Sequence, residues 1–406
     1  MADKSDIEWT DATWNPITGC SVVSPGCTNC YAMKLAGTRL QHHPSRAGLT
    51  TMRKAGPVWN GQVRFNRDWL LQPLHWRKPR RIFVCAHGDL FHESVPDAWI
   101  DQVFAVMALA PQHTFQVLTK RSKRMREYLT STGGGNRSDV RNHLAFVATP
   151  NVLNRWCPGW KSEEIDGPHR SLGIAACAQW PLPNVWLGVS TEDQQRADER
   201  IPDLLATPAA VRFISAEPLR GPINLEEVWH GESALDSECW GECNWCKDGH
   251  PPLHNCANKY PAGPGARALG ESPSLYEGRE RSGLDWVIVG GESGSGARPM
   301  HPDWVRALRD QCAAADVPFF FKQWGEWAPN IGAVDGWLID DNPEISKFDH
   351  REWEDGRWSE VFRPMWLDFQ DGNYDEEQCV SRIGKKRAGR LLDGVEHNAM
   401  PEVCRG

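Results

Sequence analysis

The chain has 406 residues, of which 24% are charged, and its formal net charge at pH 7 is −8. An acidic balance argues against broad electrostatic capture of nucleic acid, which needs a basic face, but it is compatible with a local basic cleft. The start of the chain, MADKSDIEWT, is polar and charged, and no later stretch approaches the length of a membrane span. We therefore expect a cytoplasmic protein with no membrane partner.

A short strand is predicted in ATWNPITG, residues 12–19, followed by a loop with three cysteines and by a helix that begins near Tyr31. The three thiols, Cys20, Cys27 and Cys30, are spaced C-x6-C-x2-C. Grouped cysteines in a cytoplasmic chain indicate metal binding, because a reducing compartment keeps thiols free of disulfides. A structural zinc ion takes four protein ligands, whereas an iron-sulfur cluster held by three thiolates keeps one iron open. The loop therefore predicts a [4Fe–4S] cluster.

Apolar runs farther along the chain predict a buried parallel sheet. The predicted strands begin at Arg81 (RIFVCA), Thr114 (TFQVLT), Val185 (VWLGVS), Val211 (VRFISA), Asp285 (DWVIVG) and Pro318 (PFFFKQ). Helical periodicity lies between most of them, at 97–110, 120–129, 192–206 and 302–315. This alternation predicts an α/β fold of βα units in a partial (β/α) barrel, with the carboxyl ends of all strands on one side.

Polar residues follow each predicted strand, where a parallel barrel would place its active site. The candidate substrate contacts among them are His87, His92, Lys120, Arg121, Glu217, Glu292, Arg298, Lys322 and Gln323. Glu217 and Glu292 come directly after apolar strands, and together with Lys322 they are the candidate catalytic residues. The alternative is an ion-paired network of loops, because loops between strands and helices are polar in most proteins and also supply helix caps.

Three segments interrupt the predicted barrel, which we assign to residues 1–225 and 285–327. Residues 132–183 are predicted to be a long loop excursion. Residues 226–284 are rich in Gly, Pro, Cys and His and are predicted to be an inserted module. Residues 328–406 are rich in tryptophan and acidic residues, and we expect an irregular or β-rich C-terminal cap.

The inserted module carries the second cysteine group, in CWGECNWCKDGHPPLHNC. Cys239, Cys243, Cys246 and Cys256, or three of these thiols with a histidine, would complete a small structural zinc site. The first three also have the spacing C-x3-C-x2-C, which suits the main cluster or an auxiliary iron-sulfur cluster. The main cluster is the weaker of these alternatives, because no first strand leads into the inserted module. The auxiliary cluster stays open beside zinc.

The cysteine loop after the first strand resembles that of the radical S-adenosylmethionine (SAM) enzymes. In these enzymes three cysteines bind a [4Fe–4S] cluster, and the open iron chelates the amino and carboxylate groups of SAM. They usually space the cysteines C-x3-C-x2-C, so the longer first gap of this chain is a departure. The resemblance implies cofactor contacts after the next three strands. They are Gly88 and Asp89 in HGDLF, Thr119 in QVLTKR, and Ser190 and Glu192 in LGVSTED.

More narrowly, the segments TWNPITGC, CTNCYA, DLFHE, GVSTEDQQRADERIP, GGESGSGARPMHPDWVR, FFFKQWGEW and GKKRAGRLLDG resemble a phage-associated family of three-cysteine proteins without an established function. This resemblance covers most of the chain outside the insertions. It implies a phage or prophage setting and names no substrate.

The resemblance to radical SAM enzymes implies an enzyme that takes an electron from a donor such as flavodoxin or ferredoxin and cleaves SAM to a 5′-deoxyadenosyl radical. The reaction is unassigned. A nucleotide or nucleic-acid base suits the phage setting, and a peptide or small metabolite fits the sequence equally well. Two other classes compete with this interpretation: a non-enzymatic zinc-binding α/β module that contacts nucleic acid or protein, and a zinc hydrolase that uses the open ligand position.

Overall fold

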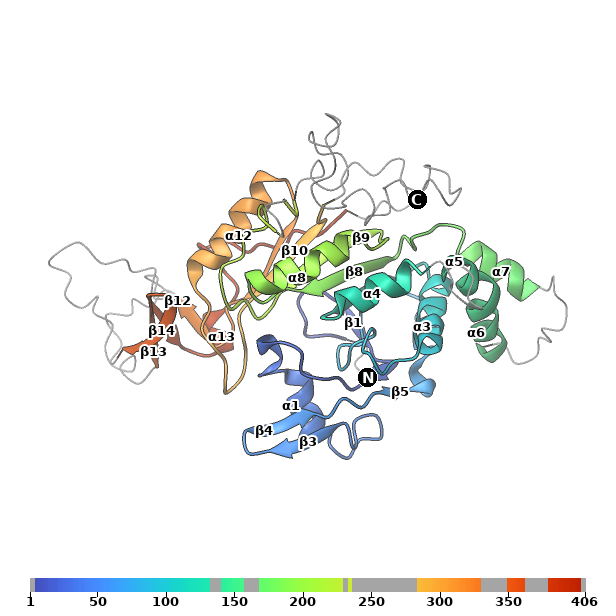
Figure 1. The fold of residues 1–406 in the computed structure, drawn as a ribbon, viewed down its shortest axis with the longest axis horizontal. Helices are drawn as coiled ribbons and strands as arrows, with labels where there is room; N and C mark the ends of the chain where they lie inside the picture. The colour runs from blue at the N-terminus through green and yellow to red at the C-terminus, as the bar shows by residue number, and fades with distance from the viewer. Residues whose placement is uncertain are drawn as a thin grey trace. The chain divides into compact units, whose positions relative to one another are not determined.

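The computed structural model describes most of the chain (Figure 1). The described residues are 4–131, 140–156, 168–228, 233–235, 283–329, 349–361 and 379–402. The chain divides into two compact units. The first unit comprises Met1–Ser190, Glu199–Phe213 and Asp236–Leu284, and the second comprises Thr191–Asp198, Ile214–Leu235 and Asp285–Gly406.

A seven-stranded sheet has the strand order β1-β6-β7-β8-β9-β10-β11. The strands are β1 (Ala12–Trp14), β6 (Arg81–Val84), β7 (Thr114–Thr119), β8 (Val185–Ser190), β9 (Val211–Ala216), β10 (Trp286–Gly290) and β11 (Phe319–Gln323). The pairings of β1 with β6, β6 with β7, β7 with β8 and β10 with β11 are parallel. The α/β class, the parallel sheet and the predicted strands are thus confirmed.

The central strands are buried along their whole length and are mainly apolar. All six residues of β8 and all six of β9 are buried. A continuous buried run, without the alternation of a half-exposed strand, is typical of parallel strands that are covered on both faces. The sequence therefore indicates these strands clearly.

In the first unit, α3 (Asp97–Leu109) follows β6 and α4 (Ser122–Leu129) follows β7, which gives two βα units. The two helices contact each other through a buried hydrogen bond of 2.7 Å from the Tyr128 hydroxyl to Asp101. Helix α8 (Gln194–Leu205) follows β8, and the division between the two units runs through α8 and β9.

Residues 140–156 and 168–176 of the predicted loop excursion at 132–183 are helical, whereas residues 177–183 are not. They form α5 (Val140–His143), the π-helical turn η3 (Leu144–Ala148), α6 (Thr149–Trp156) and α7 (Pro168–Ala176). Leu144, Ala148 and Val152 are buried at a spacing of four residues, so one face of this helical segment supplies core contacts.

Smaller elements surround the cysteine loop. They are β2 (Ile17–Thr18), η1 (Pro25–Cys27), α1 (Tyr31–Gly37), β3 (Thr50–Arg53), β4 (Gly56–Trp59), β5 (Arg64–Phe65), η2 (Arg67–Trp69) and α2 (Gln72–His75). Strand β2 pairs antiparallel with β5, and β3 pairs antiparallel with β4. Figure 1 shows α1 beside the β3–β4 hairpin. The helix predicted near Tyr31 is confirmed.

In the second unit, α12 (Pro302–Ala314) lies between β10 and β11 in the chain. His301 caps this helix, because its Nδ1 accepts a hydrogen bond from the N–H of Asp303 at 3.1 Å. A four-stranded sheet follows, with the order β12-β15-β13-β14. It consists of β12 (Trp327–Pro329), β13 (His350–Glu354), β14 (Arg357–Val361) and β15 (Cys379–Arg382), and the short helix α13 (Lys385–Ala388) comes next.

The predicted inserted module at 226–284 lies outside the described residues except for 226–228, 233–235 and 283–284. In the part of the chain that the structure describes, no helix is both long enough and apolar enough to cross a membrane.

Candidate functional site

The cysteine loop begins at Gly19, directly after β2, in the place that the sequence predicts. The N–H of Gly19 donates to the carbonyl of His87 at 3.1 Å, and Gly19 pairs with Gly88 in an isolated parallel bridge. Gly19 has φ +96°, and a Cβ there would lie 2.2 Å from the carbonyl oxygen of Gln62. Glycine alone fits this approach without moving the backbone. The loop is thereby fixed beside the carboxyl end of β6.

Cys30 immediately precedes α1. Burial raises the pKa of its thiol, and the backbone N–H groups of Met33 and Ala32 and the side chain of Trp59 partly oppose this rise. The first N–H groups of a helix have no partner within the helix, so they place partial positive charge near the sulfur. This arrangement stabilises negative charge on Cys30.

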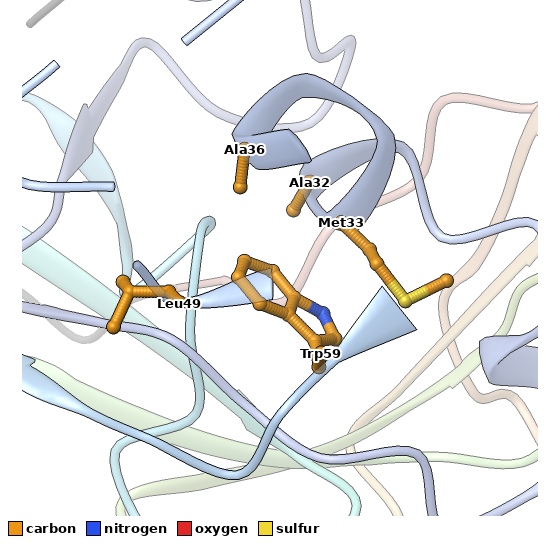
Figure 2. Packing of buried hydrophobic residues seen from close by; sticks show 5 residues of the cluster. All are labelled: Ala32, Met33, Ala36, Leu49 and Trp59. Atoms are coloured by element: carbon orange, nitrogen blue, oxygen red, sulfur yellow. The ribbon is translucent and has the colours of Figure 1, made fainter. Parts of the chain in front are cut away.

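A small apolar cluster holds α1 against the β3–β4 hairpin. Figure 2 shows the Trp59 ring facing Ala32 and Ala36 of the helix, with Met33 and Leu49 beside it. All five side chains are buried, and the partly buried Cys20 and Cys30 pack against them. The cluster therefore fixes two of the three thiols by ordinary hydrophobic packing.

Cys27 ends the short turn η1. Its N–H donates to the carbonyl of Ser24 at 2.9 Å, and its sulfur lies 3.7 Å from the Ser24 hydroxyl. The N–H of Cys30 donates in turn to the carbonyl of Cys27 at 3.2 Å. These hydrogen bonds determine how Cys27 and Cys30 are placed relative to each other.

The three thiols are close enough to influence one another electrostatically. Burial, together with the nearby charges of Asp89 and Cys30, raises the pKa of Cys20 to about 12, while Arg121 opposes this rise. Burial also raises the pKa of Cys30, and the charge of Cys27 contributes in the same direction. The raised pKa values of Cys20 and Cys30 favour the neutral thiols. A positively charged metal centre would be needed to hold all three as thiolates.

Arg121 connects the cysteine loop with the end of β7. Its Nη1 lies 3.3 Å from the Cys20 sulfur and 3.1 Å from Asp89 Oδ2, and its Nη2 donates to the Ser21 hydroxyl at 2.7 Å. Its Nε donates to Glu93 at 3.3 Å. The Arg121 and Asp89 side chains are only 5% and 6% exposed, so this is a buried ion pair. Arg121 thus places a fixed positive charge against Cys20.

Asp89 accepts hydrogen bonds from four donors of the chain itself. Oδ1 accepts from the Thr119 hydroxyl at 2.7 Å and from the N–H of Phe91 at 3.0 Å. Oδ2 accepts from Arg121 and from the N–H of Lys120 at 3.2 Å. All four donors belong to the chain itself. Through the bond to Oδ2, the Asp89 carboxylate holds the Arg121 side chain in place.

The donor set of three thiols in one loop is chemically compatible with an iron-sulfur cluster. Cysteine sulfur is the usual ligand of such clusters, and hydrogen bonds to the ligand sulfurs are a regular feature of their sites. Among the described residues, no three histidine, cysteine, aspartate or glutamate side chains are grouped as the ligands of one metal ion would be.

A family model described as "Protein of unknown function (DUF5131)" matches residues 4–401. The chain belongs to the DUF5131 family. No curated protein and no solved structure matches it.

The DUF5131 chain brings together several residues that the sequence assigns to cofactor binding. Asp89 and Thr119 bond to each other, and Gly88 forms the bridge with Gly19 at the start of the cysteine loop. Ser190 lies at the end of β8, 5% exposed, and its carbonyl accepts from Arg200 at 2.6 Å. Glu192 is fully buried and belongs to the second unit.

The candidate catalytic residues of the DUF5131 chain all lie in the second unit, where they form two ion pairs. Lys322 Nζ contacts Glu217 Oε1 at 2.5 Å. Glu292 accepts from the side chain of Arg298, with Nε at 2.8 Å and Nη2 at 2.6 Å, and also from the Arg298 N–H at 2.8 Å. Glu217 and Lys322 therefore share one site, whereas Glu292 is paired with Arg298.

The sequence does not predict three residues near the cysteine sulfurs. Ser21 and Ser24 lie within the cysteine loop, and Trp59 packs against it from the β3–β4 hairpin. The two serines lie between the cysteines, where serine is also common for turn formation, so nothing in the pattern separates them. Trp59 is one of 21 tryptophans, and only the packing of the hairpin on α1 shows its contact with Cys30.

The second cysteine group of the DUF5131 chain lies outside the described residues. This applies to Cys239, Cys243, Cys246 and Cys256, so the zinc site and the auxiliary cluster remain predictions.

Stability at acidic pH is expected to depend on His87. Burial and the positive charge of Arg46 lower the pKa of His87 to about 4. Between pH 6.5 and 4 the unfolded chain binds a proton at this residue and the folded chain does not, so stability falls as the pH falls. The slope is about 1.4 kcal/mol per pH unit.

Urea unfolding at pH 7 and pH 5 measures this effect. The drop in stability between the two pH values should be about 2 kcal/mol smaller in His87→Gln than in the wild type. His42→Gln is the control, because His42 is exposed. An equal drop in His87→Gln and the wild type would contradict the prediction.

Proposed function

We propose that this DUF5131 chain is a radical SAM enzyme that holds a [4Fe–4S] cluster through Cys20, Cys27 and Cys30. The observation that carries the proposal is the electrostatically coupled thiol trio in one loop, with Arg121 donating to the Cys20 sulfur. The loop begins directly after β2, and Gly19 bridges Gly88 just beyond the carboxyl end of the parallel strand β6. Parallel α/β proteins place their ligand sites at such strand ends.

The seven-stranded parallel sheet supports the proposal at the level of architecture. A partial barrel of the radical SAM type would use such a sheet, with the cluster loop after the first strand. The departure to C-x6-C-x2-C spacing is accommodated here by the turn η1, which occupies part of the longer gap.

The chain's own residues would prepare the site for the cofactors. When bound, a cluster with one open iron supplies the electron that cleaves SAM reductively. Arg121 orients Cys20 and partly balances the thiolate charge, Asp89 and Thr119 hold Arg121, and the packed helix α1 excludes water behind Cys30. Gly88 and Ser190 remain proposed SAM contacts. The electron donor would be a flavodoxin or ferredoxin.

Glu217 and Lys322 are proposed to act on the substrate, because a carboxylate and an ammonium group in direct contact can exchange a proton. Glu292 is held on both oxygens by Arg298, so we propose that it positions Arg298. The substrate class that we favour is a nucleotide or nucleic-acid base.

Anaerobic reconstitution with iron and sulfide tests the cluster. Wild-type protein should be brown, absorb broadly near about 400 nm and bind about four iron atoms per chain at the trio. With SAM and a reductant it should release 5′-deoxyadenosine. The triple variant Cys20→Ala, Cys27→Ala, Cys30→Ala should lose the colour and the activity.

The chain offers a matched control. The described free cysteines outside the trio are Cys85, Cys177 and Cys312, all buried, and their triple alanine variant should keep the cluster. Brown colour that survives in the trio variant would assign the main cluster to the second cysteine group. Colourless wild-type protein with zinc alone would overturn the proposal in favour of the zinc-binding module. Hydrolytic activity without SAM or reductant would favour the zinc hydrolase.

A further inference from the structure

A cavity of about 380 Å³ lies entirely within the second unit. Its volume is in the range of small-molecule sites. Four arginines line it, Arg220, Arg298, Arg351 and Arg382, and Asp349 is the one carboxylate among the lining residues. The backbone of residues 295–299 and the side chains of Trp327 and Trp358 complete the wall.

The positive charge of this cavity is only partly neutralised. Arg298 is fully paired with Glu292. Arg351 lies 3.4 Å from Asp349 and 3.7 Å from Glu360, which are long ion pairs at exposed carboxylates. These contacts leave the guanidinium of Arg351 available to a ligand, because exposed pairs of this kind are weak.

Arg382 donates to backbone carbonyls instead of a carboxylate. Its Nη2 lies 2.7 Å from the Ser295 oxygen and 3.1 Å from the Gly294 oxygen, and within the described residues it has no acidic partner. Arg382 therefore brings a net positive charge to the loop that forms the cavity wall.

Arg220 is crowded by a second cation. Burial and the charge of Arg298 lower the pKa of Arg220 against the opposing charges of Asp193, Glu292 and Glu192. The one carboxylate oxygen within 4 Å among the described residues, on Asp193, is 3.9 Å away. Its Nε is buried and has no hydrogen-bond partner among the described residues. A buried donor without a partner is costly, so an anion at this position would relieve both the charge repulsion and the missing hydrogen bond.

Trp327 and Trp358 form the aromatic side of the cavity. Trp327 is 4% exposed and donates from Nε1 to the carbonyl of Ala297 at 2.8 Å, which holds the loop. Trp358 is only partly buried, and its ring centroid lies 5.2 Å from that of Trp353 and 6.3 Å from that of Trp304. Trp358 therefore presents a fixed aromatic surface beside the arginines, and such surfaces stack on planar rings.

We propose that this cavity binds a nucleotide unit, with the phosphate on Arg220, Arg351 and Arg382 and the base against Trp358. Guanidinium groups match phosphate oxygens in geometry and charge, and aromatic side chains stack on bases of any sequence. The unit can belong to a free nucleotide or to a single-stranded nucleic acid. The site requires neither the cluster nor SAM, so it stands apart from the proposed radical chemistry.

Calorimetric titration of the full chain, without SAM or reductant, tests the proposal. The probes are the four ribonucleoside 5′-monophosphates, the matching nucleosides, inorganic phosphate and a short single-stranded oligonucleotide. We expect saturable binding of the monophosphates, tighter than that of phosphate or nucleosides. If the oligonucleotide binds only as tightly as a monophosphate, the site is assigned to free nucleotides. If the oligonucleotide binds more tightly, the site is assigned to single-stranded nucleic acid.

Substitutions of residues that line the cavity test whether the nucleotide binds there. Arg382→Gln and Arg351→Gln should each weaken monophosphate binding on the order of tenfold to a hundredfold, as expected for one charge-assisted hydrogen bond. Trp358→Leu should remove the advantage of monophosphates over phosphate. The control is Arg357→Gln on the exposed part of the same hairpin, which should change affinity less than about twofold.

Circular dichroism of each variant verifies that the fold is retained. Absence of saturable binding by every monophosphate and by the oligonucleotide would overturn the proposal. It would also be overturned if nucleosides bound as tightly as monophosphates, or if Arg357→Gln weakened binding as much as both cavity arginine variants. None of these results would bear on the cluster, which is measured by iron content and colour.

Discussion

The Asp89→Asn variant is expected to lower the free energy of unfolding by about 3–5 kcal/mol, because it removes one partner of a buried ion pair. Asp89 and Arg121 are both almost completely buried, and Asp89 accepts four hydrogen bonds. An amide cannot replace the charge, and it turns one acceptor oxygen into a donor. Arg121 would then lose the anchor that holds it against Cys20. Urea unfolding and iron content after reconstitution measure the two effects.

Asp11→Asn is the matched control for this prediction. Asp11 pairs with Arg81 at 3.0 Å, but the two side chains are 46% and 36% exposed. Exposed pairs contribute about 0–1 kcal/mol, so this variant should be nearly as stable as the wild type and should load iron normally. A loss of less than about 1 kcal/mol in Asp89→Asn would show that the buried pair does not support the site.

Gly19→Ala should destabilise the first unit by about 2–5 kcal/mol, from left-handed backbone strain together with overpacking. The added Cβ would meet the carbonyl oxygen of Gln62, which belongs to the backbone and cannot rotate away. Because Gly19 directly precedes Cys20, the displacement should also reduce iron loading. Thermal unfolding and iron analysis of the reconstituted variant test both parts.

Gly48→Ala separates the effect of backbone strain from the effect of overpacking. Gly48 also has a positive φ, +78°, but a Cβ there would have no heavy atom within 4 Å. Its cost should therefore be limited to the backbone strain of about 1–2 kcal/mol, with no effect on iron content. Equal behaviour of the two alanine variants would mean that the contact between Gly19 and Gln62 does not hold the loop.

The sequence indicates the sheet of this protein well because its strands are short apolar runs with helical periodicity between them. The buried runs of β8 and β9 are clear examples. The helices within 140–176 are less visible, because the proline in α6 and the flanking glycines suggest a loop. Their helical structure depends on burial of Leu144, Ala148 and Val152, which is a tertiary effect.

The sequence predicts several residues of the candidate site, but it does not predict which residues they bond to. Cys20, Cys27, Cys30, Asp89 and Thr119 are visible because they stand at strand ends or at a metal-ligand spacing. Sequence alone does not show that Asp89 and Thr119 bond to Arg121, since this requires the ends of two neighbouring strands to meet. Glu292 is a candidate catalytic residue from the sequence. Because Arg298 bonds to both oxygens of its carboxylate, we propose instead that Glu292 positions Arg298.

The polar groups near the cysteine sulfurs have an electrochemical consequence for the cluster that we propose at this loop. Positive charge and hydrogen bonds near a ligand sulfur withdraw electron density and make reduction easier, so they would shift the midpoint potential upward. The N–H groups of Met33 and Ala32, which favour the Cys30 thiolate, belong to the helix backbone, and side-chain substitutions do not remove them. Arg121, in contrast, reaches Cys20 through its side chain. In the proposed cluster, one part of the potential would therefore be set by the backbone, while another would change with a single substitution.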